Sequence, residues 1–432
     1  MTAVRFLSSL FAALSLIAAP RALAQEDGLR VGQAKVDITP TIPVTLAGYA
    51  SRTNLSQGVH DPLSARALAF EHRGKRLVLV STDILGFYNE TCEPLRAAIL
   101  EACQLKPAEL FLAAIHTHAA PNPALQRALG HANNVAYTQG LRTQLMNVVQ
   151  AALANLAPGS VGTGAGASPV GANRRQTVTD SAGRSRVVLG RNPAAMTDRE
   201  VQVVRVRRAP GDAVAAVLFA YATHSTSLGP GNYLISGDVH GLAEQFVETH
   251  LGNGVVAPGF AGASGDIDPW FRVRPEFKTT NSWIPEPVLL GTLLGEEVVN
   301  VSLAIREVSR VGPVSSILKT VDLPAKSREE NRAASGAPTL PLTITVGRVG
   351  RVAVVGLGGE VFNDIGRTIK AASPFSPTLV ITHCNGAAGY LPVKQAYAEG
   401  GYEVQTSRFA DGAAEMVLKE VAALLKELKD IR

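Results

Sequence analysis

The chain has 432 residues, of which 46% are hydrophobic and 18% are charged, a composition that excludes general disorder. Its formal net charge of +5 comes from 41 basic and 36 acidic side chains scattered along the chain. No basic run is interleaved with aromatic residues, so we expect no nucleic-acid partner. Three cysteines are too few for a disulfide scaffold, and no CxxC pair favours a thiolate metal site.

The first 24 residues have the pattern of a signal peptide. Arg5 precedes an apolar stretch at residues 6–19, and Ala22-Leu23-Ala24 supplies the small residues of a cleavage site before Gln25. The apolar stretch is shorter than a membrane-spanning helix needs. We therefore predict a secreted or periplasmic protein with no transmembrane anchor after signal removal, and one mature domain over residues 25–432.

Short β-rich segments alternate with longer helical patterns along the rest of the chain. The predicted strands are Ala34–Ile38, Arg76–Ser81, Glu109–Ile115, Val201–Val206, Val214–Ala222, Val255–Ala257, Leu342–Val346, Arg351–Val355 and Leu379–Thr382. The predicted helices are Glu90–Cys103, Val135–Ala154, Gly241–Leu251, Pro287–Val308, Val361–Ala372 and Ala413–Leu428. This alternation predicts an α/β fold with mixed β-sheets flanked by helices. Residues 158–199, rich in Gly, Ser and Arg, are expected to form a long irregular excursion.

Polar residues follow several of the predicted strands at the point where each strand ends. They are His116 and His118, His224, Asp266 and Asp268, Glu360, and Tyr390. Ligand sites in α/β sheets gather beyond the carboxyl ends of the strands, so we expect a site there.

Imidazole and carboxylate are the usual zinc ligands where thiolates are absent. His116, His224 and Glu360 would supply two nitrogens and one oxygen and leave a position for water. Two simpler interpretations remain open. A histidine after a strand is often an ordinary hydrogen-bonded loop residue, and Glu360 could merely open the helix predicted at Val361–Ala372, where the helix dipole favours a negative charge.

At these motifs the chain resembles the neutral/alkaline non-lysosomal ceramidase family, in its N-terminal catalytic domain. The resemblance begins at Ala34-Lys35-Val36-Asp37-Ile38-Thr39-Pro40 and covers most of the mature chain. Its most specific motifs are His116-Thr117-His118-Ala119-Ala120-Pro121, His224-Ser225-Thr226-Ser227, Gly265-Asp266-Ile267-Asp268-Pro269 and Gly359-Glu360-Val361-Phe362.

The resemblance implies a zinc ion held by His116, His224, Glu360 and Tyr390, with Tyr397 and Tyr402 as neighbouring alternatives to Tyr390. It also implies that His118, and Arg174 after Asn173, contact the reacting amide region.

The chain departs from the family pattern in two places. Asp268 stands where the family has the serine assigned as catalytic, and the chain stops at Arg432 without the family's immunoglobulin-like C-terminal domain. A carboxylate cannot donate to an oxyanion unless it is protonated, but it can accept a hydrogen bond from substrate or act as a base. A simpler interpretation is that Asp268 caps the turn at Pro269. Both departures leave open whether ceramide is the substrate.

We therefore expect an exported zinc-dependent amidohydrolase that cleaves an N-acyl bond of a lipid or small-molecule substrate by a zinc-activated water. His118 or Asp268 would pass the proton to the leaving amine. One alternative is a catalytically silent lipid- or glycan-binding protein on the same fold. Another is a zinc-independent esterase using Ser264 or Ser227, although the chain lacks a GxSxG turn.

Overall fold

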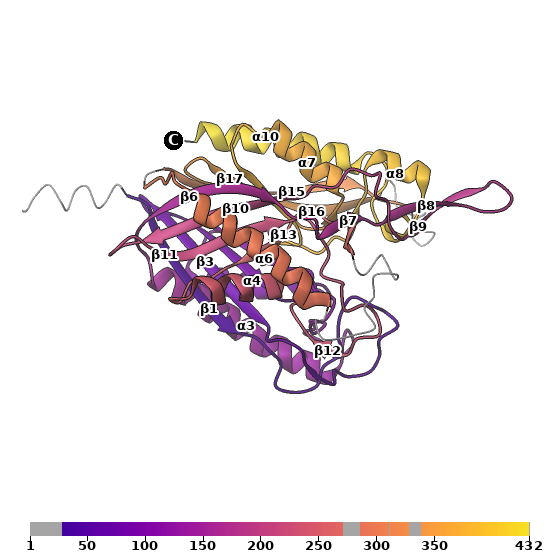
Figure 1. Ribbon diagram of the computed structural model, residues 1–432, viewed down its shortest axis with the longest axis horizontal. Coiled ribbons are helices and arrows are strands. Elements are labelled where there is room, and N and C mark those ends of the chain that lie inside the picture. The colour runs from indigo at the N-terminus through magenta and orange to yellow at the C-terminus, as the bar shows by residue number, and fades with distance from the viewer. Residues whose placement is uncertain (1–27, 271–285, 311, 328–337, 432) are drawn as a thin grey trace, which may run out of the picture.

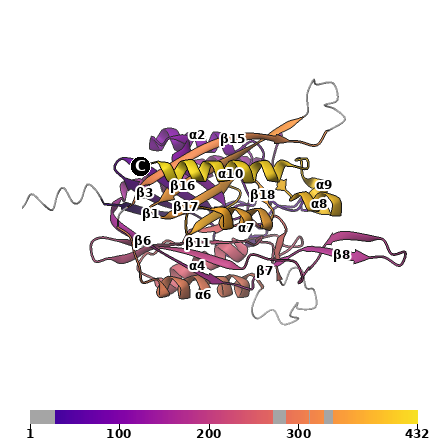
Figure 2. The ribbon, with the colours of Figure 1, turned by 90° about the horizontal axis from the view of Figure 1, so that it is seen from above.

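Two β-sheets pack face to face, and helices cover the outer face of each sheet (Figures 1 and 2). The computed structural model describes residues 28–270, 286–310, 312–327 and 338–431, so the predicted signal peptide lies outside the described residues. The sheets mix parallel and antiparallel strands, as the alternation of elements predicts.

The larger sheet has eight strands. Their spatial order is β13 (Gly259–Ala261), β11 (Ala213–Tyr221), β10 (Glu200–Arg208), β6 (Ala157–Ala167), β1 (Arg30–Asp37), β3 (Ser64–His72), β4 (Lys75–Thr82) and β5 (Leu110–Ala114). The pairs β11–β13 and β4–β5 are parallel, whereas the other neighbours are antiparallel.

The smaller sheet has the order β15 (Val314–Pro324), β16 (Thr339–Val349), β17 (Val352–Leu357) and β19 (Thr378–Ile381), and only its last pair is parallel. Four two-stranded ribbons complete the described β-structure. They are β7 (Gly171–Asn173) with β14 (Ile267–Pro269), β8 (Arg175–Thr179) with β9 (Ser185–Leu189), β12 (Leu234–Ile235) with β2 (Gly58–Val59), and β18 (Glu360–Val361) with β20 (Tyr390–Leu391). The β8–β9 ribbon projects from one end of the molecule (Figure 1).

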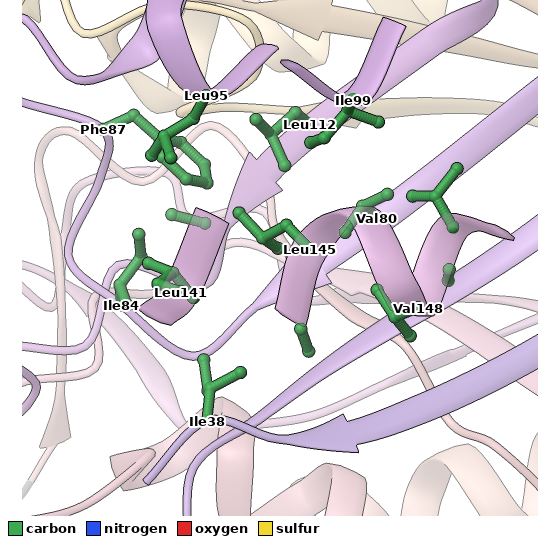
Figure 3. Packing of buried hydrophobic residues seen from close by; sticks show 14 of the residues in the cluster. Ile38, Val80, Ile84, Phe87, Leu95, Ile99, Leu112, Leu141, Leu145 and Val148 are labelled. Atoms are coloured by element: carbon green, nitrogen blue, oxygen red, sulfur yellow. The ribbon is translucent and has the colours of Figure 1, made fainter. Parts of the chain in front are cut away.

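Side chains alternate between the two faces of each sheet, which explains the separate hydrophobic layers. Leu79 on β4 and Phe111 on β5 face the smaller sheet, while Val80 and Leu112 face the helices α2 (Cys92–Cys103) and α3 (Ala132–Ala154). Figure 3 shows this helix-facing layer, in which Val80 and Leu112 lie with residues of both helices.

The remaining helices cover the other outer surfaces. Helices α4 (Asp238–Leu251) and α6 (Glu286–Ala304) pack on β10 and β11. Helices α7 (Asn363–Ala372) and α10 (Ala413–Asp430) pack on the smaller sheet, and α8 (Lys394–Glu399) and α9 (Tyr402–Thr406) lie between them in the chain. On α10 the buried residues Val417, Val421, Leu424 and Leu428 recur every three or four positions, the spacing of one helix face.

Each of the six predicted helices corresponds to a helix, and eight of the nine predicted strands correspond to strands. The strand predicted at Val255–Ala257 is reduced to a single parallel bridge between Val256 and Ala216 of β11, and the strand in this segment, β13, begins at Gly259. The predicted irregular excursion at 158–199 is wrong, since it contains β6 and three further strands.

The glycines that suggested an irregular excursion have a packing role in β6. A Cβ added at Gly162 would lie 2.6 Å from the side chain of Ile305, and one at Gly164 would lie 2.8 Å from Val301 on α6. These residues alternate on one face of the strand, so the glycines allow helix α6 to approach the sheet.

Helix α6 also contains an 18-residue apolar stretch, Pro287–Ala304, which is long and apolar enough to cross a membrane. Half of that stretch is buried inside the molecule, and core helices of soluble proteins pass the same test. The stretch is therefore weak evidence for a membrane anchor.

Candidate metal centre and active site

The fold brings the predicted metal ligands together from both sheets. His116 lies two residues after β5, and His224 lies three residues after β11. A parallel bridge between Thr117 and Ser225 holds these two segments side by side. Glu360 and Tyr390 are direct partners in the β18–β20 ribbon. Glu360 thus lies on a strand and precedes α7 by three residues, which argues against a role as the opening residue of that helix.

The ring nitrogens of His116 and His224 converge on Glu360. Its Oε2 lies 3.5 Å from His116 Nε2 and 3.7 Å from His224 Nε2, while Oε1 accepts a hydrogen bond of 2.9 Å from Tyr88. Oε2 is buried and has no hydrogen-bond partner within the described chain. Two ligands at about 2.0–2.1 Å from one tetrahedral zinc lie about 3.4 Å apart. The spacing and the unpartnered carboxylate oxygen therefore fit a shared metal ion.

Backbone carbonyls fix the orientation of both imidazoles. His116 Nδ1 lies 2.7 Å from the carbonyl oxygen of Leu85, and His224 Nδ1 lies 2.8 Å from that of Ser264. A carbonyl can only accept, so each Nδ1 carries the proton and each Nε2 keeps its lone pair for the centre. This arrangement of a donating nitrogen behind a ligating one is usual for metal-bound histidines.

Electrostatics keep the centre in the protonation states that a metal requires. Burial alone would raise the pKa of Glu360, but the neighbouring imidazoles, His116 first, hold it well below its usual range. Burial lowers the pKa of His224, and Arg174 lowers it further. The centre therefore presents the carboxylate of Glu360 and the neutral imidazole of His224, the forms that bind divalent cations.

His118 lies beside the predicted ligands. Its Nε2 is 3.4 Å from His116 Nε2, and the nitrogens of His116, His118 and His224 all lie within 4.8 Å of one another. Gly48, at φ +95°, makes room for the ring, because a Cβ there would collide with it. Burial and the nearby His116 lower the pKa of His118 well below its usual range, so the ring is neutral and can accept a proton.

Arg174 and Asp268 meet at the β7–β14 ribbon next to this centre. Arg174 donates from Nη1 to Asp268 over 3.2 Å, from Nη2 to the Tyr390 hydroxyl over 3.1 Å, and from Nε to Glu403 over 2.8 Å. Asp268 is 1% exposed and also accepts from the Thr226 hydroxyl. Its carboxylate is therefore part of an ion pair, which goes beyond capping the turn at Pro269.

The three candidate tyrosines differ in where their hydroxyls lie. The Tyr390 hydroxyl bonds to Arg174, and burial followed by Glu360 raises its pKa well above the usual value. The Tyr397 hydroxyl instead donates to the carbonyl of Phe409 over 2.9 Å. Tyr402 is 45% exposed, with its ring 5.8 Å from that of Tyr390. Tyr390 is thus the tyrosine that is paired with Glu360 and bonded to Arg174.

Three further residues of the centre escaped the sequence analysis. His383 lies two residues after β19 and stacks on His116, so the strand-end rule applied to the other histidines would have found it. Tyr88 and Glu403 carry no such signal, because each reaches the centre from a loop or short helix far away in the chain.

Comparisons with known proteins identify the family and the fold. Residues 29–270 match the sequence model of the neutral/alkaline non-lysosomal ceramidase family, N-terminal region. Neutral ceramidase 2 of Arabidopsis thaliana is 27% identical over 243 residues, which cover 52% of this chain and 30% of that protein. The neutral ceramidase of Pseudomonas aeruginosa is 27% identical over 287 residues, which cover 64% of this chain and 42% of that protein. These matches thus span less than half the length of either relative.

The structural comparison extends further along the chain. The crystal structure of the neutral ceramidase from Pseudomonas aeruginosa matches with a TM-score of 0.74 at 19% identity, covering 93% of this chain and 75% of that one. At this identity the match establishes a shared fold. It is important here because Glu360 and Tyr390 lie beyond the residues matched by the family's sequence model.

Proposed function

The chain belongs to the neutral/alkaline non-lysosomal ceramidase family, and on that premise we propose that it is an exported zinc-dependent hydrolase of an amide (N-acyl) bond. The observation that carries the proposal is the convergence of His116, His224 and Glu360 around an unpartnered carboxylate oxygen, with Tyr390 paired to Glu360. Such a donor set, without thiolates, suits zinc.

His116, His224, Glu360 and Tyr390 would hold the ion, which when bound supplies a Lewis acid for the carbonyl and lowers the pKa of water. The protein's own groups supply orientation and proton transfer. The carbonyls of Leu85 and Ser264 keep both ligand rings in one tautomer. His118, neutral and buried, accepts a proton at Nε2 from the water that attacks the amide carbonyl. It then returns this proton to the leaving amine nitrogen.

Arg174 and Asp268 act on the substrate side of this proposal. Arg174 fixes the Tyr390 hydroxyl, while its positive charge is balanced by Asp268 and Glu403. A carboxylate at position 268 favours substrates that offer a hydroxyl, amide N–H or ammonium group and disfavours anions. We propose an N-acyl lipid or small N-acyl molecule as the substrate class, because the relatives are named neutral ceramidases.

The competing function is a catalytically silent lipid- or glycan-binding protein. Asp268, in place of a hydroxyl, is the observation that favours it. The convergence of His116 and His224 on Glu360 favours catalysis, because the buried carboxylate oxygen without a hydrogen-bond partner is explained by a bound metal ion that can activate water.

An activity screen tests the proposal. The purified mature chain is assayed on N-acyl sphingoids, N-acyl amino acids and simple esters, once zinc-loaded and once chelated. We expect turnover of at least one N-acyl class, its loss on chelation and its return with added zinc. Zinc binding without turnover would support the silent binder, and chelator-resistant turnover blocked by a serine reagent would support the esterase. Export is tested separately, by sequencing the N-terminus of the secreted protein, which should begin at Gln25.

A further inference from the structure

Resting on the proposed metal centre, we propose that His383 is a positioning residue that holds the His116 imidazole in its metal-binding orientation by stacking on its face. The two rings lie 3.8 Å apart between centroids and are inclined by only 13°. His383 is 2% exposed, so the contact is shielded from water.

The orientation of the His116 ring depends on rotation about its Cα–Cβ and Cβ–Cγ bonds. The hydrogen bond from Nδ1 to the carbonyl of Leu85 limits this rotation at the edge of the ring, whereas a ring stacked on its face blocks movement perpendicular to the ring plane. His118 and His224 meet the ring at steep angles, 87° and 73°, so neither lies flat against it. His383 is the aromatic neighbour that lies flat against the ring within the described chain.

The backbone of His383 is itself anchored to both halves of the centre. Its carbonyl accepts from the Ala114 N–H at the end of β5, two residues before His116, and its N–H donates to the carbonyl of Gly359, one residue before Glu360. The stacking ring is therefore attached to the segments that carry two of the predicted ligands, one from each sheet.

Both stacked histidines have backbone conformations that non-glycine residues seldom adopt. The φ angle is +61° at His116 and +52° at His383. Such conformations are costly and cluster at functional sites, where the surrounding structure holds them in place. Two of them in one stacked pair indicate that the fold maintains this contact.

The stacking geometry also separates His383 from the ligands. The nitrogens that converge in the described residues belong to His116, His118 and His224, and His383 is not among them. His383 thus presents its ring face to the centre, and a phenyl ring should replace it where an aliphatic side chain should not.

The test compares His383→Phe, His383→Leu and His383→Ala in the full mature chain. Zinc affinity is measured by competition with a chromogenic chelator, and ligand geometry is measured by the visible spectrum of the cobalt-substituted protein. Loss of a supporting residue behind a metal ligand typically weakens binding 10- to 100-fold. We expect the Leu and Ala variants to lose affinity on the order of tenfold and to shift the cobalt spectrum, and His383→Phe to remain within about twofold of the parent. Cys384→Ala is the matched control, a neighbouring fully buried residue whose loss should affect stability alone.

Three outcomes would overturn the inference: unchanged affinity and spectrum in folded His383→Leu, damage in His383→Phe equal to that in His383→Leu, or an equal affinity loss in Cys384→Ala. Failure of the parent protein to bind zinc at all would instead refute the proposed function. The Phe and Leu variants keep the test decisive if His383→Ala does not fold.

Discussion

Two buried charged clusters differ in how completely their polar atoms are paired. In the larger sheet, Arg66 is fully buried and donates to Glu244 over 2.5 Å, to Glu248 over 2.7 Å and to Asp83 over 3.3 Å. These carboxylates also accept bonds from Ser81 and from backbone N–H groups. At the candidate metal centre, by contrast, Glu360 Oε2 and His118 Nδ1 are buried without a hydrogen-bond partner among the described residues.

This difference indicates that the Arg66 cluster stabilises the fold, whereas the cluster around Glu360 binds a ligand. Buried polar atoms nearly always have hydrogen-bond partners in folded proteins. The two unpaired atoms, Glu360 Oε2 and His118 Nδ1, therefore indicate a partner from outside the described chain. The Arg66 cluster joins β3 and β4 to α4 and is complete without a ligand. The cluster around Glu360 is incomplete, which is the physical argument for a bound cation there.

The largest expected effect comes from removing a ligand of the incomplete cluster. His116→Ala and His224→Ala should each lower zinc content and reduce turnover to background, because each variant leaves only one of the two imidazole nitrogens to bind the ion. Elemental analysis and initial rates measure this, with the exposed His250→Ala as control. Full zinc occupancy in both variants would refute the ligand assignment.

Breaking the complete cluster should affect stability and leave metal binding intact. Arg66→Met would leave Asp83 and Glu244 buried without their cation, whereas Glu248 would keep its ion pair with Lys35. Removing one partner of a buried ion pair typically costs about 3–5 kcal/mol of the free energy of unfolding. Denaturant unfolding measures the loss, and adding Glu244→Gln should recover part of it. A loss of zinc from the folded Arg66→Met protein would contradict the separation of the two clusters.

His240 is a buried histidine whose polar atoms are fully paired, and the pH dependence of stability tests its role. Both of its nitrogens are paired, with Ser225 Oγ at 2.9 Å and the carbonyl of Tyr221 at 3.2 Å, and burial lowers its pKa to about 4. The unfolded chain binds this proton more tightly, so the stability from neutral His240 is complete above pH 6.5 and is lost as the pH falls through 4. The loss amounts to about 3 kcal/mol for a shift of this size. The unfolding free energies at pH 7 and pH 4 should therefore differ less in His240→Gln than in the parent protein. An equal difference in both proteins would contradict this role of His240.

His118 should be needed for turnover more than for metal binding. His118→Ala is expected to keep most of the zinc and lose on the order of 10²-fold in kcat, the usual range for an acid–base group. Because its Nε2 lies 3.4 Å from that of His116, the metal content of the variant decides its role. Zinc loss equal to that of His116→Ala would make His118 a ligand.

The smallest effect is expected at Asp268. Asp268→Ser removes a buried carboxylate that pairs with Arg174, which keeps its ion pair with Glu403. The variant should therefore lose some stability but still fold and keep its zinc. We expect about a tenfold lower kcat/KM on the true substrate, equal to about 1.4 kcal/mol of transition-state stabilisation, together with a rise in any weak cleavage of ceramide. An unchanged kcat/KM would rule out a role for Asp268 in substrate choice.

Local signals made much of this protein predictable. The three- and four-residue spacing of buried residues predicted α10, and the apolar run before His224 predicted β11, because both patterns depend only on neighbouring residues. The strand-end rule and the family motifs selected His116, His224 and Glu360, and the fold brings them together. Local patterns failed at β6, where glycines required by the approach of α6 suggested an irregular segment.

By itself, then, the sequence determined the fold class, most of the helices and strands, and which residue types stand at the strand ends, since each of these depends on short-range periodicity or on a motif. Only the tertiary structure decided which of those residues share one centre and what supports them. Tyr88 bonds to Glu360 across 272 positions of the chain, and Arg174 bonds to Tyr390 across 216. His383 reaches His116 only because the two sheets pack face to face. Contacts of this kind depend on the docking of distant surfaces, which leaves no periodic trace in the sequence.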